Sequence, residues 1–114
     1  MITKLVAAIV IGGAVFVLPA VAQPTPPTDA AVAEAARLFD EGVAATERGD
    51  LAAALAAFQA SYAANPIPDV LYNAGQCQMG LGLLPEAANT FRDYVALVGD
   101  AMSPEERAEF EALL

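Results

Sequence analysis

Side chains that could carry out catalysis are few in this 114-residue sequence, and none has a suitable partner nearby. The sequence contains no histidine, and no lysine follows residue 4, so the hydroxyls of Ser61 and Ser103 have no base to activate them. Asp40 and Glu41 are adjacent, and on a helix they would point to different sides instead of flanking one substrate bond. No glycine-rich phosphate loop is present. These absences predict a protein that is not an enzyme.

The single cysteine, Cys77, excludes an internal disulfide, and the lack of histidine excludes most transition-metal sites. We therefore expect no cofactor and no metal. Cys77 lies on a predicted helix without a basic neighbour to lower its pKa, which favours a buried, small apolar side chain. An intermolecular disulfide in an oxidising compartment is the alternative.

Acidic residues dominate the charge of the chain. All fourteen carboxylates lie after residue 28, where only four arginines oppose them. Such a surface repels phosphate, so we expect no nucleic-acid partner and no binding to anionic lipid. A protein or peptide with basic residues, or loosely held cations, would be compatible with the charge. The acidity could also serve solubility alone.

The N-terminal segment has the pattern of a secretory signal. Lys4 precedes an apolar run over residues 5–18, and Pro19 and the small-x-small motif of Ala20 and Ala22 follow. Cleavage after Ala22 would leave Gln23 as the new N-terminus, so we assign residues 1–22 to a signal peptide with a helical core. An uncleaved membrane anchor over residues 5–22 is the alternative. Under both interpretations we expect the rest of the chain to be exported, to the periplasm or to the outside of the cell. Residues 23–28 form a proline-rich linker.

Residues 29–114 have the periodicity of an all-α domain of five helices. The first four form two pairs, with turns at Gly49-Asp50 and Gly82, and Asn65-Pro66 separates the pairs. We expect Asp29 to cap the first helix. Ser103-Pro104-Glu105-Glu106 predicts a capping box for the last one. The expected apolar stripe of the first helix comprises Val32, Ala35, Ala36, Phe39 and Val43. That of the last helix comprises Phe110, Leu113 and Leu114, with its glutamates on a solvated outer face.

The two helix pairs repeat at an offset of 33 residues. Gly42 matches Gly75, Ala54 matches Ala87, and Phe58 matches Phe91. Together with Pro66, this pattern resembles the tetratricopeptide repeat (TPR), and the stretch from Leu71 to Cys77 is similar to exported bacterial members. The resemblance implies two helix-turn-helix repeats, over residues 35–67 and 68–100, and a capping helix over 103–114, which together form a short α-solenoid. The glycines, alanines and phenylalanines would then pack the repeats together.

The resemblance also implies a concave groove that binds a partner. Its positions are matched by the following residues: Phe39, Asp40, Val43, Thr46 and Glu47 in the first repeat, and Tyr72, Asn73, Gln76, Met79 and Gly80 in the second. Asn73 matches an asparagine that bonds peptide backbone in the family. Asp69 stands where some members have a basic residue that clamps a terminal carboxylate, so that clamp is not expected. The groove would suit a protein segment with apolar and basic residues.

These observations leave three hypotheses for function. The first is a non-catalytic TPR scaffold for protein–protein interaction in the bacterial cell envelope. The second is a structural or assembly subunit that forms a homo-oligomer through its helical faces, held at the membrane if the N-terminal segment is uncleaved. The third is a binder of cations or cell wall. A two-repeat array is short, so we expect marginal stability unless the chain self-associates or docks on a partner.

Overall fold

The computed structural model describes residues 25–114, and every regular element in that part of the chain is a helix. Five α-helices follow one another: α2 (Asp29–Glu47), α3 (Leu51–Ala64), α4 (Pro68–Gly80), α5 (Leu84–Val98) and α6 (Pro104–Leu113). A short 3-10 helix, η2 (Gly99–Ala101), joins the last two. The prediction of an all-α domain is confirmed. The predicted signal segment, with Ala20, Ala22 and Gln23, lies outside the described residues.

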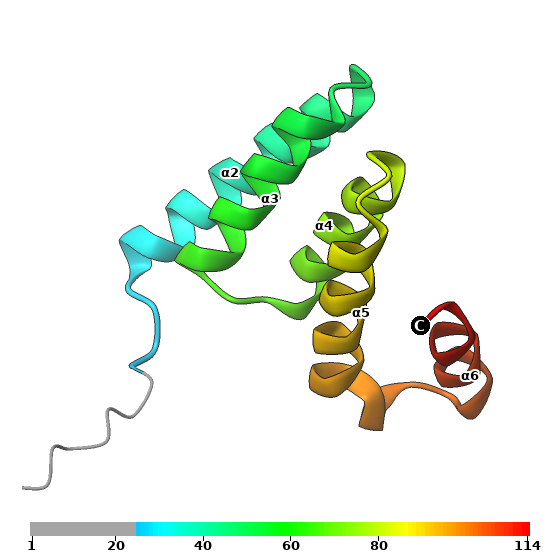
Figure 1. Ribbon diagram of the computed structural model, residues 1–114. Coiled ribbons are helices and arrows are strands. Elements are labelled where there is room, and N and C mark those ends of the chain that lie inside the picture. Colours follow the sequence, from blue (N-terminus) through cyan, green and yellow to red (C-terminus); the bar gives the residue numbers. More distant parts are fainter. Residues whose placement is uncertain (1–24) are drawn as a thin grey trace, which may run out of the picture.

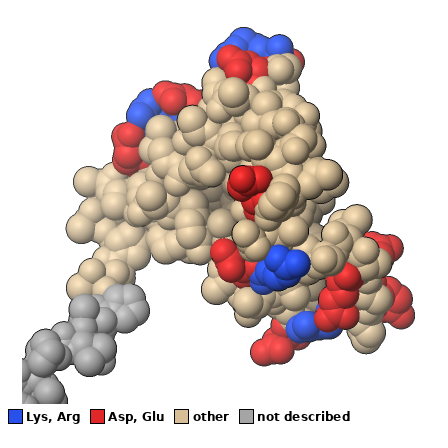
Figure 2. Space-filling view, in the orientation of Figure 1, with Lys and Arg blue, Asp and Glu red and all other residues tan. Residues whose placement is uncertain are grey.

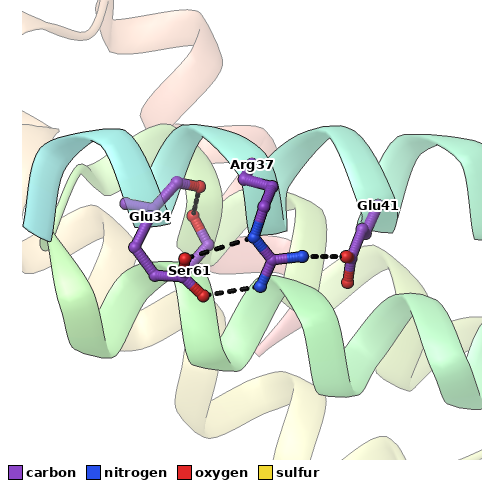
Figure 3. Close-up of polar contacts among 5 residues, drawn as sticks. Glu34, Arg37, Glu41 and Ser61 are labelled. Atoms are coloured by element: carbon purple, nitrogen blue, oxygen red, sulfur yellow. Dashed lines mark hydrogen bonds and ion pairs between the residues drawn. The ribbon is translucent and has the colours of Figure 1, made fainter. Parts of the chain in front are cut away.

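The helices form two successive hairpins and a final single helix (Figure 1). Helices α2 and α3 pack along each other, as do α4 and α5, and α3 contacts α4. The buried hydroxyl of Ser61 on α3 donates a hydrogen bond of 2.8 Å to the carbonyl of Ala35 on α2 (Figure 3). Helix α6 lies beside the end of α5. In the described residues no helix is long and apolar enough to cross a membrane.

The turns and caps explain where the helices begin and end. Gly49 and Gly82 have positive φ angles of 80° and 78°, which glycine adopts without steric cost. Asp50 caps α3 by accepting from the amide of Ala53, and Ser103 and Glu106 form the predicted capping box of α6. The predicted cap of α2 at Asp29 is wrong. Thr28 is the N-cap, and Asp29 is the first helical residue, where its charge favours the helix N-terminus.

The two hairpins bury equivalent residues at their internal crossings. A Cβ atom built on Gly42 would lie 2.5 Å from the ring of Phe58, and one on Gly75 would lie 2.7 Å from the ring of Phe91. Ala54 and Ala87, the paired alanines of the repeat, are also buried. An aromatic contact also repeats at the offset of 33 residues. The ring centroids of Phe39 and Phe58 are 5.5 Å apart, and those of Tyr72 and Phe91 are 5.9 Å apart. The crossings are therefore alike in both hairpins.

Two of the predicted apolar stripes differ from the observed burial. In α2 the buried residues are Ala35, Gly42 and Ala45, whereas Val32, Ala36 and Val43 are exposed. The close approach of α3 accepts only small side chains at the crossing, so the larger valines lie beside it. In α6, Phe110 is partly buried, but Leu113 and Leu114 are exposed, because only one side of this short helix packs on the hairpin.

Candidate functional site

Two neighbouring hollows between α2 and α4 form the α2–α4 groove. The first, the Phe39 hollow, has a volume of about 340 Å³ and is lined by Val32, Phe39 and Asp40 of α2 and by Ile67, Asp69 and Val70 at the start of α4. The second, the Val43 hollow, also has about 340 Å³. Its walls include Val43, Thr46 and Glu47 of α2, Phe58 of α3, and Asn73 and Gln76 of α4.

A third hollow, of about 420 Å³, lies on the other side of α4, against α5 and α6. We call it the Tyr72 hollow. It is lined by three aromatic rings and three carboxylates: Tyr72, Tyr94, Phe110, Asp69, Glu106 and Glu109, together with Asn73 and Met102. Asp69 also lines the Phe39 hollow, and Asn73 also lines the Val43 hollow. Helix α4 is therefore a wall common to all three hollows.

Most of the residues that the TPR resemblance assigned to a groove lie at these hollows. Phe39 and Asp40 line the Phe39 hollow, and Val43, Thr46, Glu47, Asn73 and Gln76 line the Val43 hollow. Tyr72 lies instead at the Tyr72 hollow, where it contacts the ring of Phe110. Met79 and Gly80 are exposed on α4 and line none of the three.

Sequence reasoning missed several residues of the site. Val32 and Ile67 border the groove. Tyr94 and Phe110 lie with Tyr72 at the Tyr72 hollow, although each of these three residues is more than fifteen positions from the next in the sequence. Glu106 and Glu109 are exposed, as expected for the outer face of α6, and they also line the Tyr72 hollow. Their spacing of three residues and the neighbouring Phe110 place them on one side of the helix, which is the signal that could have found them.

The electrostatics of the three hollows are acidic. They are lined by five carboxylates, Asp40, Glu47, Asp69, Glu106 and Glu109, and by no basic residue. The arginines lie elsewhere. Arg37 forms ion pairs with Glu34 and Glu41 on the exposed side of α2 (Figure 3), and its hydrogen bond holds the pKa of Glu34 below the usual value. Arg48, Arg92 and Arg107 line other surface hollows.

Uncharged side chains cover much of the surface between these charges. Figure 2 shows one face of the molecule, on which the charged side chains form separate groups at the tip and along one side of the first hairpin and over the lower part of the molecule, with uncharged side chains between them. The groove adds exposed apolar positions to this surface, among them Val32, Val43 and Ile67. An open apolar surface bordered by carboxylates is suited to a partner that presents apolar and positively charged side chains.

The acidic side chains and the cysteine of the described residues are not grouped as metal ligands. No group of three or more acidic or cysteine ligands lies close enough to hold a metal ion within residues 25–114. Cys77 is buried beside the Val43 hollow, and its burial raises the pKa of the thiol, which keeps it protonated at neutral pH. Comparison of the chain with known protein families, curated proteins and solved structures finds no match.

Proposed function

We propose that the chain is a non-catalytic scaffold that binds a segment of another protein in the α2–α4 groove. The observation that carries this proposal is the composition of the groove, in which apolar side chains such as Phe39 and Val43 alternate with Asp40, Glu47 and Asp69 and no basic side chain is present. The preferred segment has apolar residues that fill the hollows and basic residues that meet the carboxylates.

The proposal includes the finer identity of the fold. The hairpins α2–α3 and α4–α5 are two TPR repeats, and α6 is the capping helix of a short α-solenoid. The equivalent contacts of Gly42 with Phe58 and of Gly75 with Phe91 support this, because a repeat protein reuses one crossing geometry in each unit. Stacking in this way presents the first helix of each hairpin to a common face, where the groove lies.

The proposal also covers the location of the protein. The basic start, apolar run and small-residue exit of the N-terminal segment support export to the periplasm or the outside of a bacterial cell, with cleavage after Ala22. Retention of that segment as a membrane anchor is the alternative. The acidic charge of the groove supports a protein or peptide partner and argues against nucleic acid. No cofactor is part of the proposed function.

Selection from a random peptide library tests the groove directly. The full chain should enrich peptides that contain both apolar and basic residues. A Val43→Arg variant places a bulky positive charge in the groove and should weaken binding of those peptides about tenfold or more. Leu97→Arg, at an exposed position outside the three hollows, is the matched control and should bind normally. Enrichment of acidic peptides, or equal binding by both variants, would refute the proposal.

A homo-oligomeric assembly subunit is the second candidate. Three leucines are widely exposed, two at opposite ends of α5 and one at the end of α6: Leu84 (60%), Leu97 (56%) and Leu113 (63%). Such side chains could pack between copies of the chain. Sedimentation velocity separates the candidates, because an assembly subunit would form oligomers that the Leu97→Arg or an equivalent Leu84→Arg substitution dissociates, whereas Val43→Arg would leave them intact.

A further inference from the structure

The Tyr72 hollow contains a cluster of aromatic rings that meet at tilted angles. The ring centroids of Tyr72 and Tyr94 are 5.6 Å apart, those of Tyr94 and Phe110 are 5.6 Å apart, and those of Tyr72 and Phe110 are 6.1 Å apart. The interplanar angles of these pairs range from 46° to 75°, so no two of the rings stack in parallel. Tyr72 is 37% exposed, and Tyr94 and Phe110 are partly exposed, so part of the aromatic cluster remains accessible at the hollow.

The carboxylates of this hollow have few partners inside the protein. The side-chain carboxylates of Asp69 and Glu109 form no hydrogen bond or ion pair with any residue from 25 to 114. One oxygen of Glu106 accepts from the backbone amide of Ser103 at 3.3 Å, and its other oxygen has no partner in this range. The nearby arginines, Arg92 and Arg107, line a separate hollow with Gly99 and Leu114. No basic side chain of the described residues therefore pairs with the carboxylates of the hollow.

Tyr94 reports the negative potential of the hollow. Burial is the main cause that raises the pKa of its phenol, and the negative charges of Asp69 and Glu106 raise it further, since an ionised phenol would face them. Burial disfavours a charge of either sign, whereas the negative charges of Asp69 and Glu106 favour a cation at this position.

We propose that the Tyr72 hollow binds the guanidinium group of an arginine side chain from the partner. A guanidinium is planar and permanently charged, so it can stack on an aromatic face and at the same time donate paired hydrogen bonds to a carboxylate. The inference rests on the proposed peptide-binding function, and it adds that the bound segment contains an arginine. Asp69 and Asn73 connect the hollow to the α2–α4 groove, so a segment in the groove can extend an arginine across α4.

A small arginine probe tests the hollow without the rest of a peptide. The full chain is prepared with isotope-labelled tyrosine, and N-acetyl-arginine amide is titrated into it. The signals of the tyrosine rings are followed by NMR. N-acetyl-citrulline amide, which has the same shape without the charge, is the matched ligand. We expect the arginine probe to shift the signals of Tyr72 and Tyr94 and to bind about tenfold more tightly than the citrulline probe. Equal affinity for the two probes would overturn the inference.

Two substitutions that each remove one negative charge distinguish binding at the Tyr72 hollow from a general attraction of the probe to an acidic protein. Glu109→Gln should weaken binding of the arginine probe severalfold. Glu86→Gln, on an exposed residue of α5 that lines none of the three hollows, should leave it unchanged. An equal loss in both variants would show a diffuse attraction and overturn the inference.

The proposed function can survive this result, because library peptides that depend on Val43 would still bind. If the library yields no peptide, the scaffold function fails, and a surviving arginine signal marks an isolated cation site.

Discussion

At the scale of single residues, two glycines set how closely the helices of each hairpin approach. Gly42 faces the ring of Phe58 and Gly75 faces the ring of Phe91, in both cases with no room for a Cβ atom. The buried rings occupy the space that a side chain on the first helix would otherwise take, and burial of each ring contributes about 1.5–3 kcal/mol. A large residue on one helix and a missing side chain on the other are therefore a matched pair.

This pairing predicts that Gly42→Ala destabilises the protein. The added methyl group would contact a buried aromatic ring, and overpacking should outweigh the better helix propensity of alanine, lowering the free energy of unfolding by about 1–2 kcal/mol. Urea denaturation followed by circular dichroism measures the change. Gly80→Ala is the control: its methyl group would meet only the end of the flexible Leu51 side chain, and we expect a change within about 0.5 kcal/mol. Equal losses in the two variants would contradict the pairing.

Tyr94 predicts a loss of stability at alkaline pH. Its pKa is raised in the folded protein, so the folded state holds the phenolic proton more tightly than the unfolded state does. This contribution is fully present below the pKa of an unfolded tyrosine, about 10, and is lost as pH rises through the higher folded value. Urea denaturation at several pH values should show a smaller alkaline loss for Tyr94→Phe than for the wild type. Tyr62→Phe, which retains Tyr94, is the control for the removal of a tyrosine hydroxyl elsewhere in the protein. Identical alkaline profiles for all three proteins would contradict this prediction.

At the scale of the elements, helix ends could be predicted well because their signals are local. Asp50, the glycines of the two turns and the capping box at Ser103 each act within one turn of helix. Burial within a helix was harder to predict. Periodicity identified Val32 and Val43 as the buried side of α2, but the tight crossing selects the small residues beside them, and close approach depends on the partner helix.

The residues of the candidate site also differ in whether they could be predicted from the sequence. The groove residues of α2 and α4 could be named because the resemblance to the TPR family implies which positions of each repeat line a groove. The Tyr72 hollow could not, because it forms only when α6 returns to place Phe110 against Tyr72 and Tyr94. No local pattern specifies that contact, since the three aromatic residues lie on three different helices.

The position of α6 depends on its N-terminal cap, which gives a prediction for this element. Ser103→Ala removes the hydroxyl that accepts from the amide of Glu106, and it should destabilise α6 by about 1 kcal/mol. Hydrogen exchange should become faster for the amides of α6 and remain unchanged in α2. Thr28→Ala, which removes the cap of α2, should have the opposite pattern. Unchanged exchange in α6 would mean that packing alone holds the helix.

At the scale of the whole molecule, the core is small. Among residues 25–114, nine apolar residues are buried, and five of them are alanines, so few large side chains contribute. Small domains bury a modest share of their surface, which limits the hydrophobic stabilisation available to two hairpins and one extra helix.

We therefore expect a low free energy of unfolding for the isolated chain, about 5 kcal/mol or less. Denaturation in urea gives this value, and thermal melting over a series of protein concentrations shows whether association adds to it. Sedimentation over the same series identifies the species present. A monomer with a high melting temperature that does not vary with concentration would contradict the expectation.

The shared wall formed by α4 makes the hollows thermodynamically dependent on one another. Asp69 borders both the Phe39 hollow and the Tyr72 hollow, so a cation held on one side neutralises a charge that the other side also experiences. An occupant of either hollow must then alter the affinity of its neighbour, and the coupling free energy is the same in both directions. For a segment that occupies both hollows at once, the binding free energy would therefore differ from the sum of the binding free energies for the separate hollows.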